Sequence, residues 1–489
     1  MSTCAGPVRS GSAAVRARLD HPVIDSDGHL TEYRPVFMEY LRDVGGAAIA
    51  ARFQSAVEAV REDPAWIRQS PAERLDARTP RPVFWGVPTR NTADLASVYL
   101  PDLLYERLDE YGLDFTVLFP GLGMTVIHIE DEEVRRAACR ALNRYYAEIF
   151  GTHPDRMAPV AVIPMHTPAE AIKELEYAVR TLKLRAVLVP SHVRRPIAAI
   201  ARAHPAAARE AFWIDTYGLD SEHDYDPFWA RCVELKVVPA FHSRSFGWTN
   251  HRSVSNYVYN HVGHFADSAE ALCKSLFLGG VPRRFPDLRL AFLEGGIGWA
   301  RSLLSDLVGH WRKRNYAALE DFNPRNLDTG LARRLVQQYG GRLAAGRTLP
   351  DDFMLPLQVD SPARSAALDD FARCGIATAA DIGAVFSANF HFGCEADDPV
   401  TASAFDAHRN PLRLRMNAVF GSDIGHWDVP DMSAVLAEAW EPVEEGTMTA
   451  GDFRDFVFAN PVRMWAGANP EFFKGTVVEA AAAKLLGGG

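Results

Sequence analysis

The sequence predicts an α/β fold, a (β/α)8 TIM barrel, from three observations. From residue 112 onward, short β-rich runs alternate with helical patterns, which is typical of a parallel sheet built from βαβ units. Several runs are unbroken apolar stretches, as expected for strands that are buried on both faces. With one further run near residue 23 the candidate strands number eight, and 489 residues accommodate one such barrel with insertions.

The candidate strands follow one another in a regular order. They comprise residues 23–25, 114–119, 157–163, 184–189, 237–241, 288–293, 384–390 and 418–420. The segment before the fourth strand shows the alternation most clearly. Thr167 is suited to the N-cap of a helix, Pro168 to its first position and Glu170 to a capping box. Apolar residues then recur at helical spacing up to residue 182, which predicts a βαβ unit.

Two stretches do not fit the alternation and are interpreted as helical insertions on the barrel. They are residues 34–100, after the first strand, and residues 312–380, between the sixth and seventh strands. The sequence therefore predicts a disordered tail over residues 1–20, a single barrel domain over residues 21–475 and a C-terminal tail over residues 476–489.

Composition excludes several classes of protein. The net charge of −10 offers no electrostatic case for binding nucleic acid or an anionic membrane. No window approaches the roughly 18 apolar residues of a spanning helix, and the first twenty residues do not form a secretory signal. The six cysteines form no CxxC pair, which argues against a zinc knuckle or a disulfide framework. We expect a soluble, cytoplasmic protein.

Polar residues that can bind a metal recur at the ends of the predicted strands. Asp27 and His29 end the first strand, and because alternate residues of a strand point the same way, these side chains would project together. His242 ends the fifth strand, Glu294 the sixth and Asp423 the eighth. The C-terminal ends of barrel strands converge on one rim, so these side chains are expected to meet there.

A single strand-end histidine or Asp-x-His pair is a weak signal, because such residues are commonly structural. Acids and imidazoles that each end a different strand are harder to explain in that way. Clustered carboxylates repel one another, and a cation removes that cost. We therefore predict one or two divalent cations per chain, with iron, zinc and manganese all open. A non-enzymatic barrel that keeps these residues for structure is the alternative.

Six stretches of this sequence together form a specific pattern: IDSDGH (24–29), FH (241–242), RFPDLR (284–289), FLEGGIGW (292–299), FGSDIGHW (420–427) and FANPVR (458–463). In these stretches the chain resembles the amidohydrolase superfamily, from about residue 22 to residue 472. The resemblance is to the branch of TIM-barrel metal-dependent hydrolases that contains aminocarboxymuconate-semialdehyde decarboxylase.

The resemblance implies that Asp27, His29, His242 and Asp423 are metal ligands, and that Asp423 also handles the proton of a metal-bound water. Decarboxylases of this branch commonly have histidines at the positions of Asp27 and Glu294. The two extra carboxylates could support a second ion, with Glu294 as a bridge, or favour iron or manganese over zinc. In this respect the chain resembles a nonheme diiron thioesterase of diterpenoid antibiotic biosynthesis.

Further candidates are weaker. Glu32 could ligate or orient the metal, or cap the following helix. His192 follows the fourth strand and is a candidate acid/base or second-metal ligand, with a solvated loop histidine as the alternative. His426 is expected to orient Asp423 or meet the substrate, and His391 and Glu395 could reach the pocket. Four arginines could meet an anionic substrate, although solvation is the default for each: Arg194, Arg195, Arg283 and Arg284.

The leading functional hypothesis is a metal-dependent hydrolase in which activated water attacks the carbonyl carbon of an acyl thioester, amide or ester. Asp423, Glu294 and His192 are its candidate catalytic residues. The chain has no Gly-x-Ser-x-Gly nucleophile elbow, which favours metal-activated water. The alternative is a metal-dependent nonoxidative decarboxylase of an aromatic or unsaturated acid. Both have a small-molecule substrate, and many barrels of this kind form homodimers.

Overall fold

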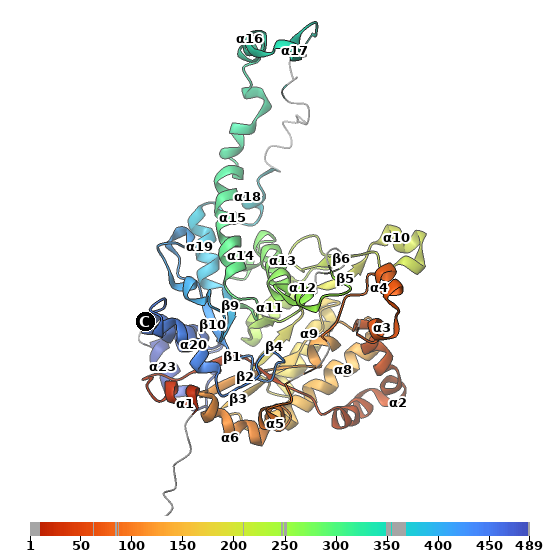
Figure 1. The fold of residues 1–489 in the computed structure, drawn as a ribbon, viewed down its shortest axis with the longest axis vertical. Coiled ribbons are helices and arrows are strands. Elements are labelled where there is room, and N and C mark those ends of the chain that lie inside the picture. The colour runs from red at the N-terminus through yellow and green to blue at the C-terminus, as the bar shows by residue number, and fades with distance from the viewer. Residues whose placement is uncertain are drawn as a thin grey trace, which may run out of the picture.

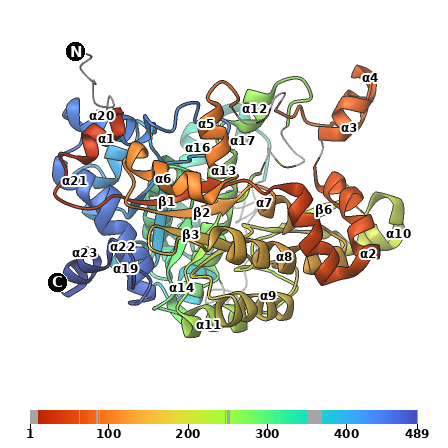
Figure 2. The ribbon, with the colours of Figure 1, turned by 90° about the horizontal axis from the view of Figure 1, so that it is seen from below.

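The computed structural model describes residues 10–61, 63–83, 86, 88–208, 210–245, 248, 252–348, 354 and 368–487. Its centre is an eight-stranded parallel sheet in the order β1-β2-β3-β4-β7-β8-β9-β10. The strands are β1 (Ile24–Leu30), β2 (Phe115–Pro120), β3 (Met157–Val162), β4 (Ala186–Val189), β7 (Pro239–Phe241), β8 (Leu290–Phe292), β9 (Phe390–Glu395) and β10 (Ala418–Gly421). Helices surround these strands in Figures 1 and 2, which confirms the predicted α/β barrel.

The barrel closes where the end of β10 meets β1. The backbone N–H of Asp423 donates to the carbonyl of Asp27 at 2.8 Å, and the N–H of His29 donates to the carbonyl of Ile424 at 2.8 Å. The closing seam therefore carries three of the predicted metal ligands. Nearly every residue of the eight strands is buried, as expected for strands that are covered on both faces.

The helix after β3 begins as predicted but uses Glu170 differently. In α9 (Pro168–Glu176) the Thr167 side chain accepts from the backbone N–H of Glu170 at 3.2 Å, so Thr167 is the N-cap. The Glu170 carboxylate forms two hydrogen bonds with the buried guanidinium of Arg135, at 2.9 and 3.0 Å, instead of completing a capping box. Arg135 belongs to the neighbouring helix α8 (Glu132–Tyr145), so this acid joins two outer helices.

The strand predicted at residues 384–390 is wrong. Residues 379–388 form helix α19 (Ala379–Ala388), and the strand β9 begins only at Phe390. Thr378 and Asp381 form a capping box at the start of α19. The short apolar run within this helix is its buried face, and periodicity alone does not separate such a run from a buried strand.

The tail predicted over residues 1–20 also needs correction within the described residues. Residues 11–16 form helix α1 (Gly11–Arg16), which packs on α20 (Val435–Glu444). The buried hydroxyl of Ser12 accepts from the backbone N–H groups of Leu436 at 3.0 Å and Ala437 at 3.3 Å. This hydrogen bonding to a distant helix gives the segment an ordered place. Residues 1–9 lie outside the described part of the chain.

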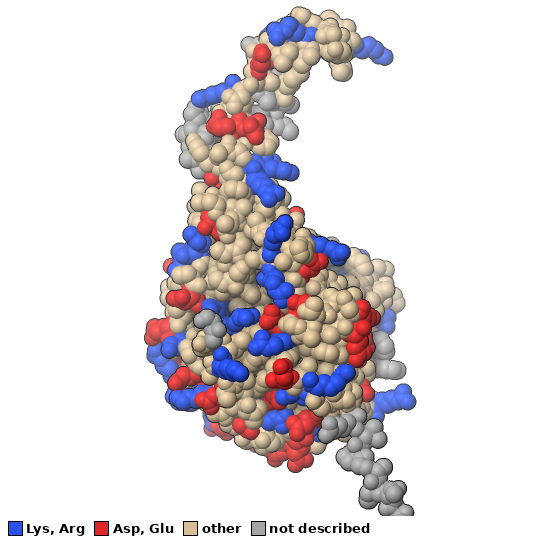
Figure 3. All heavy atoms as spheres, turned by 90° about the vertical axis from the view of Figure 1, so that its left-hand side faces the viewer, with Lys and Arg blue, Asp and Glu red and all other residues tan. Residues whose placement is uncertain are grey.

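Both predicted insertions are helical. The first contains α2 (Arg34–Val60), α3 (Asp63–Arg68), α4 (Pro71–Ala77) and α5 (Thr92–Ser97). The second begins in the last turn of α15 (Gly298–Arg314) and contains α16 (Thr329–Tyr339) and α17 (Gly341–Ala344). Together α15, α16 and α17 extend away from the barrel as an arm, which Figures 1 and 3 show clearly. A third excursion, absent from the prediction, follows β4: the antiparallel pair β5 (Val193–Pro196) and β6 (Phe212–Asp215), with α10 (Ala198–Ala203) between them.

No helix among the described residues combines the length and the apolar character that a membrane span requires. Both signs of charge are interspersed over the face that Figure 3 shows.

Candidate metal centre

Asp25 joins three neighbouring strands next to the centre. Its buried carboxylate accepts from the hydroxyl of Thr116 on β2 at 2.6 Å, and from the N–H and hydroxyl of Ser422 at 2.9 and 2.7 Å. Burial raises the pKa of Asp25 to about 6, although these hydrogen bonds oppose the shift. The starts of β1 and β2 and the residue after β10 are thereby joined through one side chain. The pairing of β1 with β2 is irregular between Asp25 and Gly28, next to Asp27.

The first group of potential ligands contains Asp27, His29 and His242. Each offers one ligand atom, and these atoms lie within 4.8 Å of one another. Oδ1 of Asp27 is 3.4 Å from Nε2 of His242 and 3.9 Å from Nε2 of His29. The three side chains are buried, so water cannot satisfy their polar atoms from outside. The structure thus brings together the predicted residues of the first and fifth strands.

The second group contains Glu294, Asp423, His426 and Asp428, again within 4.8 Å. Nδ1 of His426 is 3.0 Å from Oδ2 of Asp423 and 2.8 Å from Oδ1 of Asp428. Short contacts join the two groups: Nε2 of His29 lies 2.7 Å from Oδ1 of Asp423, and Nε2 of His242 lies 3.0 Å from Oε2 of Glu294. The two groups form one continuous cluster at the barrel rim, which we call the donor cluster.

Many atoms of the donor cluster are close together without forming hydrogen bonds. Oδ1 of Asp27, Oε2 of Glu294, both oxygens of Asp423 and the ring nitrogens of His29 and His242 are buried and have no hydrogen-bond partner. Each such atom would cost about 1–3 kcal/mol if left unsatisfied. A cation bound between these atoms would satisfy their lone pairs, which explains why they converge without hydrogen-bond partners. The carboxylate and imidazole donors therefore fit a divalent cation.

Two of these ligands have unusual backbone conformations. Glu294, two residues after β8, has φ = 56°, and Asp423, two residues after β10, has φ = 52°. Non-glycine residues seldom adopt this left-handed region, where the strain is tolerated when the surroundings impose it. With this backbone conformation, the carboxylates of Glu294 and Asp423 lie in the donor cluster.

Mutual pairing controls the charges of the cluster. Burial opposes ionisation of Asp423, but attraction to His426 and His29 outweighs it and holds the pKa of that carboxyl below its usual range. Burial likewise opposes charging of His242, yet Asp27 and Glu294 raise its pKa to about 10. Burial and repulsion from Asp423 raise the pKa of Glu294. Each of these groups changes the pKa of its neighbours because the acids and imidazoles lie so close together.

Glu32 lies outside the donor cluster, contrary to its prediction as a ligand. Its carboxylate accepts from the hydroxyl of Tyr146 at 2.6 Å and from the backbone N–H groups of Leu122 at 2.9 Å and Gly123 at 3.3 Å. These contacts hold the loop after β2, which is neither of the roles predicted for this residue. His192 also lies outside both groups of ligands.

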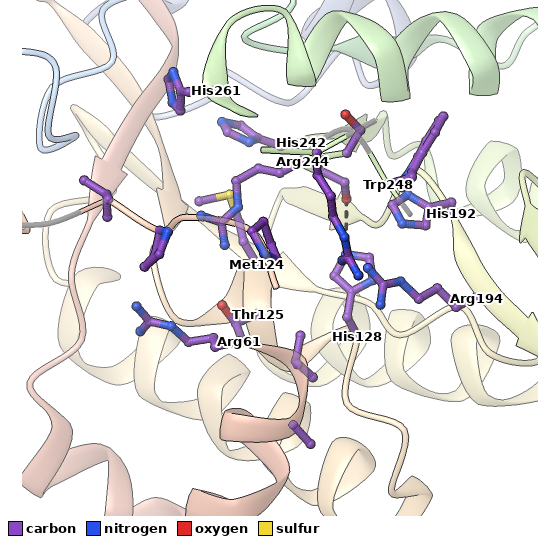
Figure 4. Close-up of a pocket in the computed structure, with 18 of the residues that line it drawn as sticks. Arg61, Met124, Thr125, His128, His192, Arg194, His242, Arg244, Trp248 and His261 are labelled. Atoms are coloured by element: carbon purple, nitrogen blue, oxygen red, sulfur yellow. Dashed lines mark hydrogen bonds between the residues drawn. The ribbon is translucent and has the colours of Figure 1, made fainter. Parts of the chain in front are cut away.

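A cavity of about 200 Å³, which we call the basic cavity, opens beside the donor cluster (Figure 4). His242 and His426 contribute to its wall, and among the other described residues that line it only Glu130 is acidic. Five arginines line it: Arg61, Arg81, Arg194, Arg244 and Arg252. Of the four arginines named from the sequence, only Arg194 belongs to this wall. Arg195 pairs with Asp215 at 3.0 Å and Arg284 with Asp226 at 2.7 Å.

Several site residues escaped the sequence analysis. His128, His166 and Arg244 line the basic cavity, and Asp428 joins the donor cluster. His166 could have been found, because it follows β3 closely, as His242 follows β7.

Glu395, which the sequence suggested could reach the pocket, lies at the end of β9 near Glu294 and Asp423. Burial, together with repulsion from both carboxylates, raises the pKa of Glu395 to about 10.

A second cavity, of about 790 Å³, reaches the donor cluster from the side of the first insertion. His29 and His426 line it together with apolar residues, including Phe53 and Val57 of α2. His426, Arg61, Met124 and Thr125 line both cavities. The donor cluster is therefore accessible to a polar group through one cavity and to an apolar group through the other.

Comparison with known proteins relates the chain to one family. A family model described as amidohydrolase matches residues 24–467. A dihydroxybenzoic acid decarboxylase from Polaromonas sp. JS666, solved with bound manganese and the inhibitor 2-nitroresorcinol, superposes with a TM-score of 0.50 at 15% identity, covering 93% of this chain and 99% of that one. The IDCase of Metarhizium anisopliae in its apo form gives a TM-score of 0.50 at 12% identity, covering 91% and 97%.

Proposed function

The chain belongs to the amidohydrolase family, and from this premise we propose that it is a metal-dependent nonoxidative decarboxylase of a small carboxylic acid. One observation carries the proposal: a buried cluster of unsatisfied ligand atoms adjoins a cavity with five arginines and one acid among its lining residues. Guanidinium groups match the two oxygens of a carboxylate better than a neutral ester or amide, which supports a carboxylate substrate at this centre.

The solved relatives add support in the same direction. The Polaromonas protein is named as a decarboxylase and holds manganese. The donor cluster here is rich in carboxylates, which suit manganese better than softer ions. The sequence pattern favours hydrolysis and leaves iron, zinc and manganese open. Because arginines line the cavity beside the donor cluster, we propose decarboxylation as the reaction and manganese as the resident ion.

Each residue of the centre has a defined task in this reaction. Asp27, His29 and His242 would hold the cation with Glu294 and Asp423. When bound, the cation supplies positive charge that binds and polarises the oxygens of the substrate. The carbon–carbon bond to the carboxylate breaks, carbon dioxide leaves, and the electron pair left on carbon takes up a proton. We assign the delivery of that proton to His426: burial opposes its protonation, but Asp423 and Glu294 outweigh this and raise its pKa well above the usual value. Asp423, whose Oδ2 lies 3.0 Å from Nδ1 of His426, keeps that imidazole charged and in place.

Replacement of Asp423 by Asn tests this assignment. The variant keeps the shape of the side chain but loses the negative charge that keeps His426 protonated, so we expect kcat to fall by about 10²- to 10⁴-fold. Release of carbon dioxide from a panel of aromatic acids, with manganese present, is the measurement. Asp431→Asn is the matched control, because Asp431 follows the same strand but is exposed and accepts hydrogen bonds from Ser433 at the surface. Full activity of D423N would refute the assignment.

Hydrolysis of an acyl thioester, amide or ester is the second candidate. It is favoured by the second cavity, whose apolar residues near His29 could accept an acyl chain, and by a second group of ligands that could hold another ion. The same substrate panel separates the two reactions. Carbon dioxide release without cleavage of thioesters or amides supports decarboxylation, whereas acyl cleavage without carbon dioxide overturns it.

A further inference from the structure

The second cavity, of about 790 Å³, connects the donor cluster with the first insertion. His29 and His426 of the donor cluster line its inner end, and Ile67 of α3 lines it at the insertion. Met124 and Thr125, which Figure 4 shows, belong to the walls of both this cavity and the basic cavity. Sites that enclose drug-sized ligands typically measure about 300–1,000 Å³. The donor cluster therefore adjoins space for a molecular body larger than the basic cavity can hold.

The second half of α2 supplies an apolar wall of the second cavity. The helix breaks at Gly46, whose φ of 79° and ψ of 174° are not helical. Beyond the break, Phe53 and Val57 lie four residues apart, so they share one face of the helix. Both line the cavity, and both are buried. Phe37, from the first half of α2, packs against Phe53 with ring centroids 5.2 Å apart. This packing fixes the apolar wall in place without a ligand.

The polar side chains along the second cavity have partners within the protein. Arg34 donates a hydrogen bond to the side-chain oxygen of Gln54. Gln54 in turn donates to the carboxylate of Glu58 at 2.6 Å, and Arg68 pairs with the same carboxylate at 3.0 Å. The Glu32 carboxylate is held by Tyr146 and by the loop after β2. These side chains require no polar group of a ligand, whereas ligand atoms of the donor cluster remain unsatisfied.

Apolar side chains continue the lining towards both ends of the second cavity. Leu122 and Met124, on the loop after β2, are half-buried. At the insertion Ile67 leaves 70% of its surface exposed, although it belongs to the wall. Apolar surface that a ligand removes from water stabilises the complex. The cavity thus offers polar ligand atoms at its inner end and apolar contacts along its length.

We propose that the second cavity binds an apolar body of the substrate, so that the enzyme acts on amphiphilic acids. The carboxylate of such an acid would lie at the donor cluster, and a hydrocarbon tail attached to the acid-bearing group would extend along α2 to α3. This inference rests on the proposed function, because the acid group must occupy the metal centre. Val57, along the wall, and Ile67, at the outer end, determine the length of tail that the cavity accepts.

Calorimetric binding to the manganese-loaded protein tests the inference without relying on turnover. The probes are benzoate, 4-pentylbenzoate and 4-heptylbenzoate, which present the same acid on the same ring with tails of increasing length. Affinity should rise with tail length, and 4-heptylbenzoate should bind about 10- to 100-fold more tightly than benzoate. Burial of the tail should also make the heat-capacity change of binding more negative. Equal affinities for the three probes would overturn the inference.

Variants show where the gain from the tail arises. Val57→Phe adds volume to the wall and should reduce the affinity ratio of 4-heptylbenzoate to benzoate about tenfold. Ile67→Asn removes an apolar contact at an exposed position, so the fold is retained, and it should reduce the same ratio about threefold. Leu75→Asn is the matched control: Leu75 is an exposed residue of α4 in the same insertion and lies outside the described lining of both cavities. Equal losses in I67N and L75N would overturn the assignment to the second cavity.

Removal of manganese shows whether the tail and the metal centre bind one molecule. Without the cation the carboxylate loses its partner, so the affinity for 4-heptylbenzoate should fall about tenfold or more. Unchanged affinity in the chelator-treated protein would show that the tail binds apart from the centre, which overturns the inference.

The failures of the two proposals are distinguishable. Carbon dioxide release from unsubstituted ring acids, with equal affinities for the three probes, overturns the inference but leaves the proposed function standing. A gain from the tail that falls in V57F and I67N, without carbon dioxide release from any acid with or without a tail, supports the assignment of the second cavity and overturns decarboxylation.

Discussion

At the residue scale, the surroundings of a buried histidine decide its charge. His242 and His391 both lie on or directly after barrel strands, and both are buried. Asp27 and Glu294 overcome burial at His242 and raise its pKa to about 10. At His391 no acid raises the pKa in this way. Burial, followed by Arg289, lowers the pKa of His391 to about 3, although backbone hydrogen bonds oppose this shift. The same residue type is therefore charged in one place, until a bound cation displaces its proton, and a neutral core residue in another.

This difference predicts a pH dependence of stability. Below pH 6.5 the unfolded chain protonates His391 whereas the folded chain does not, so the free energy of unfolding should fall as pH decreases. Between pH 6.5 and pH 5 the contribution is about 2 kcal/mol. His391→Gln should lose that part of the pH dependence, as measured by urea unfolding at both values. An equal pH dependence in the two proteins would contradict the pKa shift.

Glu32 shows how far a residue can be interpreted from its neighbours in sequence. Its position three residues after His29 suggested a ligand or a cap. The tertiary structure instead surrounds its carboxylate with Tyr146, Leu122 and Gly123, which come from other elements. These partners could not be identified from sequence spacing, because they lie about 90 or more positions away.

At the element scale, tight packing between β10 and β1 places the ligands. Gly421 ends β10, and a Cβ atom added there would lie 2.9 Å from Cβ of Asp27, closer than side chains normally approach. Glycine is thus required for Asp27 to occupy its place in the donor cluster. Gly425, with φ = 90°, similarly approaches the carbonyl of His29.

Gly421→Ala should therefore displace Asp27 and weaken metal binding. Because a displaced ligand loses its geometry, we expect manganese affinity to fall about 10- to 100-fold, as measured by isothermal titration calorimetry. Gly298→Ala is the matched control: Gly298 follows another barrel strand, and a Cβ there would meet nothing within 4 Å. If G421A folds normally and binds manganese with unchanged affinity, then the added methyl group does not displace Asp27 and the prediction is wrong.

The seventh barrel strand illustrates the limit of pattern analysis. The run at residues 384–390 is apolar enough for a strand, yet most of it belongs to α19. Thr378 and Asp381 mark the start of that helix by a capping box, a signal that was present in the sequence. The following strand contains His391 and Glu395, whose polarity disguised it.

At the scale of the whole molecule, one cation would hold the barrel closed. Its candidate ligands come from β1 and from the ends of β7, β8 and β10, which span residues 27 to 423. An ion that binds only the folded chain stabilises it by about 2.7 kcal/mol at a concentration of 100 times Kd.

Removal of the metal should accordingly destabilise the protein. Treatment with a chelator is expected to lower the melting temperature, and addition of manganese chloride should restore it in a concentration-dependent way. The double variant Asp27→Asn, His242→Gln should show no response to manganese. A chelator-treated protein as stable as the manganese-loaded one would contradict a bound cation, and elemental analysis gives the number of ions per chain.

The sequence by itself determined the alternation of strands and helices, and it placed Asp27, His29, His242, Glu294 and Asp423 at strand ends that converge. Local periodicity and the convergence of strand ends in a barrel are sufficient for these. The sequence did not determine the place of Glu32, the helix α19 or which side chains line the basic cavity. Those depend on hydrogen bonds and loop packing between residues far apart in the chain, and only the tertiary structure decides which of them become neighbours.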